Sequence, residues 1–339
     1  MGKKFPILMV TCLLVISLMI GGCTSMQSKV VTVPEKYPNR PITFIVPFGA
    51  GGGTDLVARM LEKTAITHLS QPLVITNRPG SGGALGWNEL VSATPDGYTI
   101  GISGSEIFLH PLYGTSKYNY LTALEPLVQI SSTPVIMAVQ ADQPWQNTSD
   151  LIQYAKEHPG ELKFSHGGLG TIPHVAGETF SKAATITLSQ VPFRSSAEAV
   201  TALLGGHVQV VFTNPGAVKE YVKSGMLKTL AVADTNRLAD PVFTAVPTFK
   251  EQGLDLFYGS RFGVAAPKEL PADIKTKLVE GLKAMVTDPE FKKGIEEMGL
   301  RYQYLDLKQT QEKWLYENQK LTKAVQESGV IDLIKSQKQ

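Results

Sequence analysis

The sequence predicts an α/β fold with two sheets that face each other across a cleft. Short apolar, β-branched runs alternate with helix-like segments along the chain, and repeated strand–loop–helix units favour helices on both faces of a largely parallel sheet. Two glycine loops stand at ends of predicted strands, where such sheets bind ligands. After an N-terminal leader, about 315 residues remain, which is enough for one large or two medium domains.

The elements follow one another with little ambiguity in the body of the chain. We expect strands at residues 42–46, 73–76, 98–103, 135–139, 164–165, 188–192 and 208–213. We expect a helix directly after the first glycine loop, and further helices at residues 84–93, 149–158, 174–183, 198–204 and 216–224. Three C-terminal helices are expected at 271–287, 289–298 and 307–326, the last two started by Asp288-Pro289 and Asp306. These three need a sheet to pack on, and the first domain is the natural host.

The first glycine loop is a candidate anion site. It reads Pro47-Phe48-Gly49-Ala50-Gly51-Gly52-Gly53-Thr54-Asp55 and separates a predicted strand from a predicted helix. A helix N-terminus offers unpaired N–H groups and the positive end of the helix dipole to an anion. No Lys-Ser/Thr pair follows the glycines, and they match the dinucleotide fingerprint poorly. The alternative is a tight turn that needs glycine for its positive φ.

The N-terminus is typical of an exported lipoprotein. Residues 1–22 have a basic start, an apolar stretch and the small residues Gly21 and Gly22 directly before Cys23, which would be lipidated. Residues 23–36 are predicted to form a tether. The alternative, an uncleaved membrane anchor, has an apolar stretch shorter than the ~20 residues that a spanning helix needs. We therefore place the protein outside the cytoplasm, lipid-anchored at Cys23 on the outer face of the cell membrane or a periplasm-facing membrane.

Charge and cysteine content exclude several classes of partner. The formal charge of +2 includes Lys3 and Lys4, so the mature chain is close to neutral, which argues against nucleic acid. The only cysteines are Cys12, inside the signal, and Cys23, so the mature domain has no disulfide and no cysteine-based metal site.

Several sequence blocks, in order and over the whole chain after the tether, resemble the Bug family. These proteins are the extracytoplasmic receptors of tripartite tricarboxylate transporters. The blocks are Tyr37-Pro38-Asn39-Arg40-Pro41-Ile42, Val46 to Gly52, Asn77-Arg78-Pro79-Gly80-Ser81-Gly82-Gly83, Pro95-Asp96-Gly97-Tyr98-Thr99, Gly167 to His174, Leu203 to Val208, Leu230-Ala231-Val232 and Val246-Pro247-Thr248.

The resemblance implies a two-lobed periplasmic-binding-protein (Venus-flytrap) fold, similar to type II, that the chain crosses twice. Lobe 1 would comprise residues 37–133, lobe 2 residues 134–255, and residues 256–339 would return to lobe 1 with the C-terminal helices. The resemblance also implies a small carboxylate ligand, held largely by main-chain N–H groups and ordered water and passed to membrane subunits. We expect a monomer without cofactor.

A dicarboxylate needs an anion-binding loop at each end, and the two glycine loops would supply them. The first carboxylate is assigned to Phe48, Gly49, Ala50, Gly51 and Gly52, although Phe48 could equally be a core residue. Gly167, Gly170 and Thr171 would hold the other end, and His174 would cap a helix or line the cleft. Ser103 and Ser105 are hydroxyl candidates whose alternative role is in turns and caps. The remaining candidates are Arg194, Ser195 and Asn214.

Departures from the family pattern bear on which acid is bound. The family usually has a glycine where Ser195 follows Phe193-Arg194, an acidic residue where this chain has Ala202, and tryptophan where it has Arg261. Arg194 or Arg261 could pair with a distal carboxylate, but a surface or interlobe salt bridge is the favoured interpretation for each.

Metal binding and catalysis find little support in the sequence. His158, His166 and His174 are evenly spaced but fall in three different local contexts, and no HExxH pair is present, so we expect no metal site. The chain has no Gly-x-Ser-x-Gly elbow and no paired-carboxylate signature. The sequence therefore favours a non-enzymatic solute receptor. The alternatives are an exported α/β enzyme acting on a small acid, or a ligand sensor for a membrane kinase.

Overall fold

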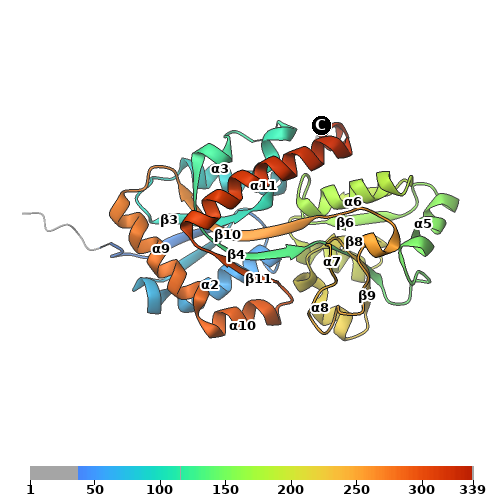
Figure 1. Cartoon of the computed structure of the whole chain (residues 1–339), viewed down its shortest axis with the longest axis horizontal. Helices are drawn as coiled ribbons and strands as arrows, with labels where there is room; N and C mark the ends of the chain where they lie inside the picture. Colours follow the sequence, from blue (N-terminus) through green and yellow to red (C-terminus); the bar gives the residue numbers. More distant parts are fainter. Residues whose placement is uncertain (1–36, 115, 338–339) are drawn as a thin grey trace, which may run out of the picture. The chain divides into compact units, whose positions relative to one another are not determined.

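The computed structural model describes residues 37–114 and 116–337. The predicted signal peptide 1–22, the tether 23–36 and the lipidation site Cys23 lie outside the described residues. Two sheets organise the described part of the chain (Figure 1).

Sheet A has the strand order β11-β4-β10-β3-β1-β2. At one side β1 (Ile42–Val46) pairs in parallel with β2 (Leu73–Asn77) and β3 (Thr99–Gly104). At the other side β10 (Gly259–Pro267), β4 (Leu124–Pro134) and β11 (Tyr302–Leu305) join through antiparallel pairs.

Sheet B has the strand order β7-β6-β8-β5-β9. Its strands are β5 (Ile136–Gln140), β6 (Lys163–His166), β7 (Ser189–Pro192), β8 (Val210–Thr213) and β9 (Leu227–Val232). β6 is parallel to β7 and β8, whereas β5 is antiparallel to β8 and β9. Both sheets are thus mixed, and the expectation of a largely parallel sheet is wrong. The reason is that β4, β5 and β10, the strands in which the chain passes between the two sheets, are antiparallel to their neighbours.

The predicted helices all form, together with two short ones that were not expected, α4 (Tyr120–Ala123) and α12 (Ile331–Ser336). They are α2 (Gly53–Leu69), α3 (Ala84–Ser92), α4 (Tyr120–Ala123), α5 (Thr148–Glu157), α6 (Ile172–Ala183), α7 (Ser196–Leu204), α8 (Pro215–Lys223), α9 (Ala272–Thr287), α10 (Pro289–Glu297), α11 (Leu307–Ser328) and α12 (Ile331–Ser336). Short 3₁₀ turns are η1 (Ser81–Gly83), η2 (Ser105–Phe108), η3 (His110–Tyr113) and η4 (Lys250–Gln252). Asp288 caps α10, and Asp306 forms a capping box with Gln309 at the start of α11, as their side chains predict.

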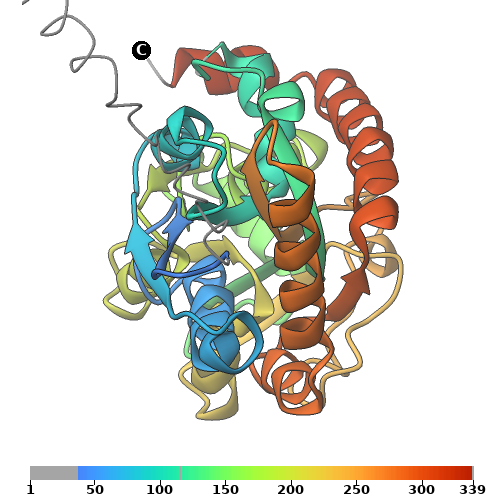
Figure 2. The same cartoon turned by 90° about the vertical axis from the view of Figure 1, so that its left-hand side faces the viewer.

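The C-terminal helices contact both halves of the fold. Leu278 of α9 and Ile295 of α10 belong to the core around sheet A, and Trp314 of α11 packs on the same half. Figure 2 shows α9 in orange and α11 in red, both running from top to bottom of the view. Val325 near the end of α11 and Ile334 of α12 instead lie in the core around sheet B. The expectation that every C-terminal helix packs on the first domain is therefore too simple, because α11 is long enough to reach the second core.

The chain passes between the sheets along adjacent strands. β4 runs into β5 with only Val135 between them, and β10 lies beside β4 (Figure 1). The Val135 N–H donates to the Tyr258 carbonyl at 2.8 Å, and the Val135 carbonyl accepts from Ala233 N–H at 2.8 Å. Backbone hydrogen bonds therefore join the two segments, around Val135 and Tyr258, in which the chain passes from one sheet to the other. They hold the loops at the strand ends of one sheet opposite those of the other.

Candidate functional site

A cavity lies between loops of the two halves, with about 380 Å³ of empty space when the open solvent at its mouth is included, and we call it the interlobe cavity. It forms where the start of α2, the turn η2 and strand β10 meet the loop before α6, the start of α7 and the end of β8. The lining residues are Phe48, Gly52, Gly53, Thr54, Glu106, Gly167, Thr171, Pro173, Ser196, Asn214, Ser260 and Phe262.

The first glycine loop is organised by Asp55, which is 1% exposed. Its carboxylate accepts the Gly51 N–H at 2.9 Å and the Asn77 side-chain amide at 2.9 Å, and that amide also donates to the Phe48 carbonyl. Gly51 has φ +78°, where glycine is favoured. The Gly49 N–H donates to the Arg194 carbonyl at 2.9 Å. Two N–H groups that the sequence assigned to a ligand thus have partners within the protein.

The start of α2 is the part of this loop that faces the cavity. Gly52, Gly53 and Thr54 all line it, and no side chain caps the helix. The first N–H groups of a helix have no partner within it, so they and the helix dipole favour an anion here. The candidate anion site therefore lies toward the C-terminal end of the predicted segment, and Ala50 is exposed.

Two histidines, His166 and His174, accept hydrogen bonds from backbone N–H groups of the second glycine loop. Gly170 N–H donates to His174 Nδ1 at 2.9 Å, and the Thr171 hydroxyl donates to the Gly168 carbonyl at 2.7 Å. The His166 and His174 rings stack at 4.3 Å. Burial, followed by the proximity of His174, lowers the pKa of His166 well below its usual value, so His166 is neutral. Of this loop, Gly167 and Thr171 line the interlobe cavity, whereas His174 is buried behind it.

Glu106, which the sequence reasoning missed, lines the interlobe cavity and is 4% exposed. Its Oε1 accepts the N–H of Ile172, the first residue of α6, at 3.4 Å. Burial raises the pKa of Glu106 above the usual value for a glutamate, although hydrogen bonds from backbone N–H groups, including that of Ile172, oppose this. The carboxyl group of Glu106 thus lies at the start of α6, the helix end that we assigned from the sequence to the second carboxylate of the ligand.

Asn214 supplies a further polar group to the cavity. It is 5% exposed, and its side-chain oxygen has no hydrogen-bond partner among the described residues. Its amide approaches to 3.5 Å from the point where a Cβ on Gly53 would lie, so it reaches the start of α2. Buried amides normally have partners, which makes this group a candidate ligand contact.

Phe48 lies both at the interlobe cavity and against the core. Its ring lines the interlobe cavity and packs edge-on against Trp87, with 5.8 Å between the ring centroids. A second cavity of about 450 Å³, which we call the outer cavity, shares Phe48 and Gly167 with the first. The exposed Arg194 lines the outer cavity.

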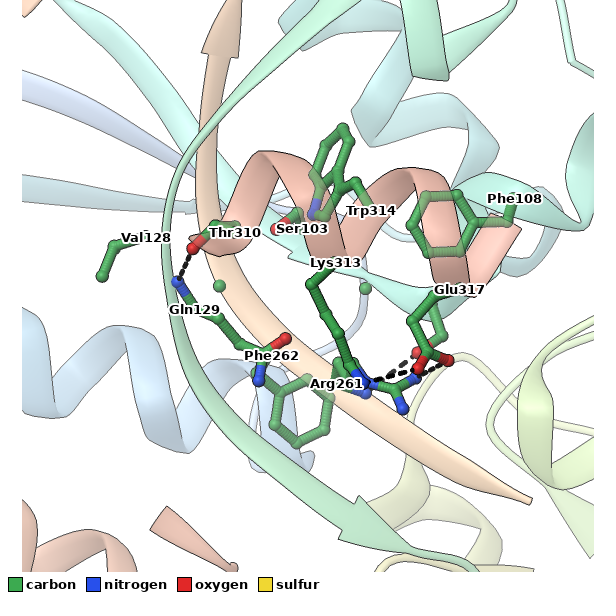
Figure 3. A pocket seen from close by; sticks show the side chains of 13 residues that line it. Ser103, Phe108, Val128, Gln129, Arg261, Phe262, Thr310, Lys313, Trp314 and Glu317 are labelled. Carbon is green, nitrogen blue, oxygen red and sulfur yellow. Dashed lines mark hydrogen bonds and ion pairs between the residues drawn. The ribbon is translucent and has the colours of Figure 1, made fainter. Parts of the chain in front are cut away.

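The predicted serines lie away from the interlobe cavity. Ser103 and Ser105 line a separate pocket under α11 (Figure 3), where the Ser105 hydroxyl accepts the Arg261 N–H at 3.0 Å. Arg261 forms an ion pair with Glu317 at 2.6 Å, and Lys313 contacts the same carboxylate at 3.1 Å. Ser195 caps α7 by accepting the Glu198 N–H. The hydroxyls of Ser105 and Ser195 therefore have structural partners.

Comparison with known proteins identifies the family. Residues 57–330 match the model of the tripartite tricarboxylate transporter family receptor. The chain belongs to this receptor family. Protein BugT of Bordetella pertussis is 36% identical to the receptor over 238 residues, covering 69% of this chain and 72% of BugT. The resemblance to the Bug family is thereby confirmed, and the family consists of solute receptors rather than enzymes.

Solved structures show the same two-lobed periplasmic-binding-protein fold as this receptor. One is the R. palustris protein Rpa4515 with adipate, with a TM-score of 0.81 and 28% identity, covering 86% of this chain and 98% of the other. Another is MatC from Rhodopseudomonas palustris with bound malate, with a TM-score of 0.75 and 25% identity, covering 88% and 99%.

Among the described residues, no three or more His, Cys, Asp or Glu side chains gather in a way that could hold a metal ion. No helix in the described ranges is both long and apolar enough to cross a membrane.

Proposed function

We propose that this receptor captures a small carboxylate in the interlobe cavity and delivers it to the membrane subunits of a tripartite tricarboxylate transporter. The observation that carries the proposal is the uncapped start of α2, where Gly52, Gly53 and Thr54 line the interlobe cavity. Adipate and malate in two structural relatives support the ligand class. The family supports a location in the periplasm or an equivalent space outside the cytoplasm.

We further propose that the receptor works as a monomer that opens and closes. Lobe 1 would comprise residues 37–133 together with residues 256–339, and lobe 2 residues 134–255. The crossing segments around Val135 and Tyr258 would be the hinge. In the structure the lobes touch, since Gly49 N–H reaches the Arg194 carbonyl.

Small organic acids should raise the melting temperature of the receptor. A ligand at 100 times its dissociation constant should stabilise the folded state by roughly 2.7 kcal/mol. Thermal-shift screening of a panel of mono-, di- and tricarboxylates checks this, with neutral sugars and nucleotides as controls. Stabilisation by a sugar but by none of the acids would overturn the proposed ligand class.

We also propose that Cys23 carries the lipid that anchors the receptor. The support is the small residues directly before Cys23 at the end of an apolar stretch. Cys23→Ser should abolish lipidation and release the protein from the membrane fraction, which fractionation and mass spectrometry measure. Cys12→Ser is the matched control and should mature normally, because that residue leaves with the signal. A Cys23→Ser protein that remains membrane-bound and is processed to the same size would refute the anchor.

A further inference from the structure

Among the described residues that line the interlobe cavity, one has an ionisable side chain, and it is acidic. Within the described part of the chain, Glu106 lines the cavity but no Lys, Arg or His side chain does. Glu106 also forms no ion pair with any described residue, unlike the buried Glu125, whose carboxylate contacts Lys275 at 2.8 Å. A buried acidic group without a cationic partner is costly, so its presence in a ligand cavity calls for an explanation.

The two helix starts that line the cavity differ in hydrogen-bonding character. At the start of α2, backbone N–H groups are available to an anion. At the start of α6, the Glu106 carboxyl already accepts the Ile172 N–H at 3.4 Å, so the positive end of that helix faces a carboxyl group of the protein. Asn214 also lines the cavity, but its side-chain amide lies near the start of α2.

We propose that the ligand is a small carboxylate that also carries an ammonium group, with its carboxylate at the start of α2 and its ammonium at Glu106. This inference rests on the proposed function and narrows its ligand class. A zwitterion brings a carboxylate to the start of α2 and an ammonium group to Glu106. A second carboxylate would instead lie beside Glu106, and no described cationic side chain lines the cavity to offset the repulsion. Burial raises the pKa of Glu106, and an ammonium partner would favour its charged form.

The first arm of the test compares ligands matched in length. Linear ω-amino acids with three to six carbons are measured by calorimetry against dicarboxylates of similar length, for example 4-aminobutyrate against succinate. We expect the best amino acid to bind roughly 10- to 100-fold more tightly than its matched dicarboxylate. If dicarboxylates bind and outcompete every amino acid, the inference fails while the proposed function stands. If no carboxylate of any kind binds, the proposed function itself fails.

The second arm assigns the preference to Glu106. Glu106→Gln keeps the shape of the side chain but removes its charge. It should weaken amino-acid binding roughly 10- to 100-fold and leave dicarboxylate binding equal or tighter. Glu125→Gln is the matched control, because it also neutralises a buried glutamate but lies outside the cavity, and it should leave the affinity ratio unchanged. An unchanged ratio of amino-acid to dicarboxylate affinity in a folded Glu106→Gln protein would overturn the inference. So would weaker dicarboxylate binding by this variant, which is expected if Glu106 keeps its proton and donates it in a hydrogen bond to a second ligand carboxylate.

Discussion

Gly82→Ala should lower ligand affinity roughly 10- to 100-fold without unfolding the protein. Gly82 lies in η1, and a Cβ at this position would come within 2.2 Å of the Leu169 carbonyl oxygen in the second glycine loop. The carbonyl cannot move aside without shifting the second glycine loop, and Leu169 of this loop lines the outer cavity. The added methyl group therefore opposes closure while it leaves each lobe intact. Calorimetry with the best acid of the panel measures the affinity, and small-angle scattering shows whether the variant stays less compact at saturation.

Gly206→Ala is the control for backbone strain. Gly206 has φ +73°, close to the +62° of Gly82, but a Cβ there would meet no atom within 4 Å. Both variants therefore cost about 1 kcal/mol for placing alanine in the left-handed region, and only Gly82→Ala obstructs closure. Equal affinities for the two folded variants would contradict the view that η1 and the second loop meet in the ligand-bound state.

Asp55→Ala should lower the free energy of unfolding by about 3 kcal/mol and also weaken ligand binding. The buried carboxylate accepts hydrogen bonds from the Gly51 N–H, the Asn77 amide and the Arg59 guanidinium. Its removal leaves the Gly51 N–H without this acceptor, leaves the Asn77 amide with only the Phe48 carbonyl of its two acceptors, and frees the loop that precedes α2. Urea denaturation measures the stability, and calorimetry measures the affinity.

Arg59→Ala separates the charge pair from the loop contacts. Arg59 is 47% exposed, so the loss of its ion pair with Asp55 should cost less than about 1 kcal/mol. Its removal leaves the two loop hydrogen bonds of Asp55 intact. If Arg59→Ala were as destabilising as Asp55→Ala, the role of Asp55 would be that of an ion-pair partner and not of an organiser of the glycine loop.

The predictable parts of the fold are those whose signals are local. Apolar runs such as Ile42–Val46 become buried strands, and Asp306 begins α11 because a side chain caps its own helix. β4 escaped prediction because Gln129, Ser131 and Thr133 are polar yet buried. Distant partners satisfy them: for example, the Ser131 hydroxyl donates to the Arg301 carbonyl at 2.8 Å.

In the candidate site, too, the residues with a local sequence signal could be predicted and those that depend on distant parts of the chain could not. The start of α2 could be found because a glycine loop before a helix is visible in the sequence. Glu106 could not, because its position depends on a helix start 66 residues further along the chain. The available signal was the acidic residue Glu106, three positions after the end of the strand predicted at residues 98–103. Ser103 and Ser105 were proposed from the same strand end, but their hydroxyls lie in the pocket under α11.

The reach of α11 and α12 into both halves bears on the order in which the chain can be completed during synthesis. Trp314 packs with residues of the first half, whereas Val325, Val330 and Ile334 close the core around sheet B. A nascent chain that still lacks its last 30 or so residues therefore leaves apolar surface exposed in the second core, and one that lacks Ile295 and Leu300 leaves the first core incomplete as well. Cooperative folding of both halves thus waits for the arrival of the C-terminus.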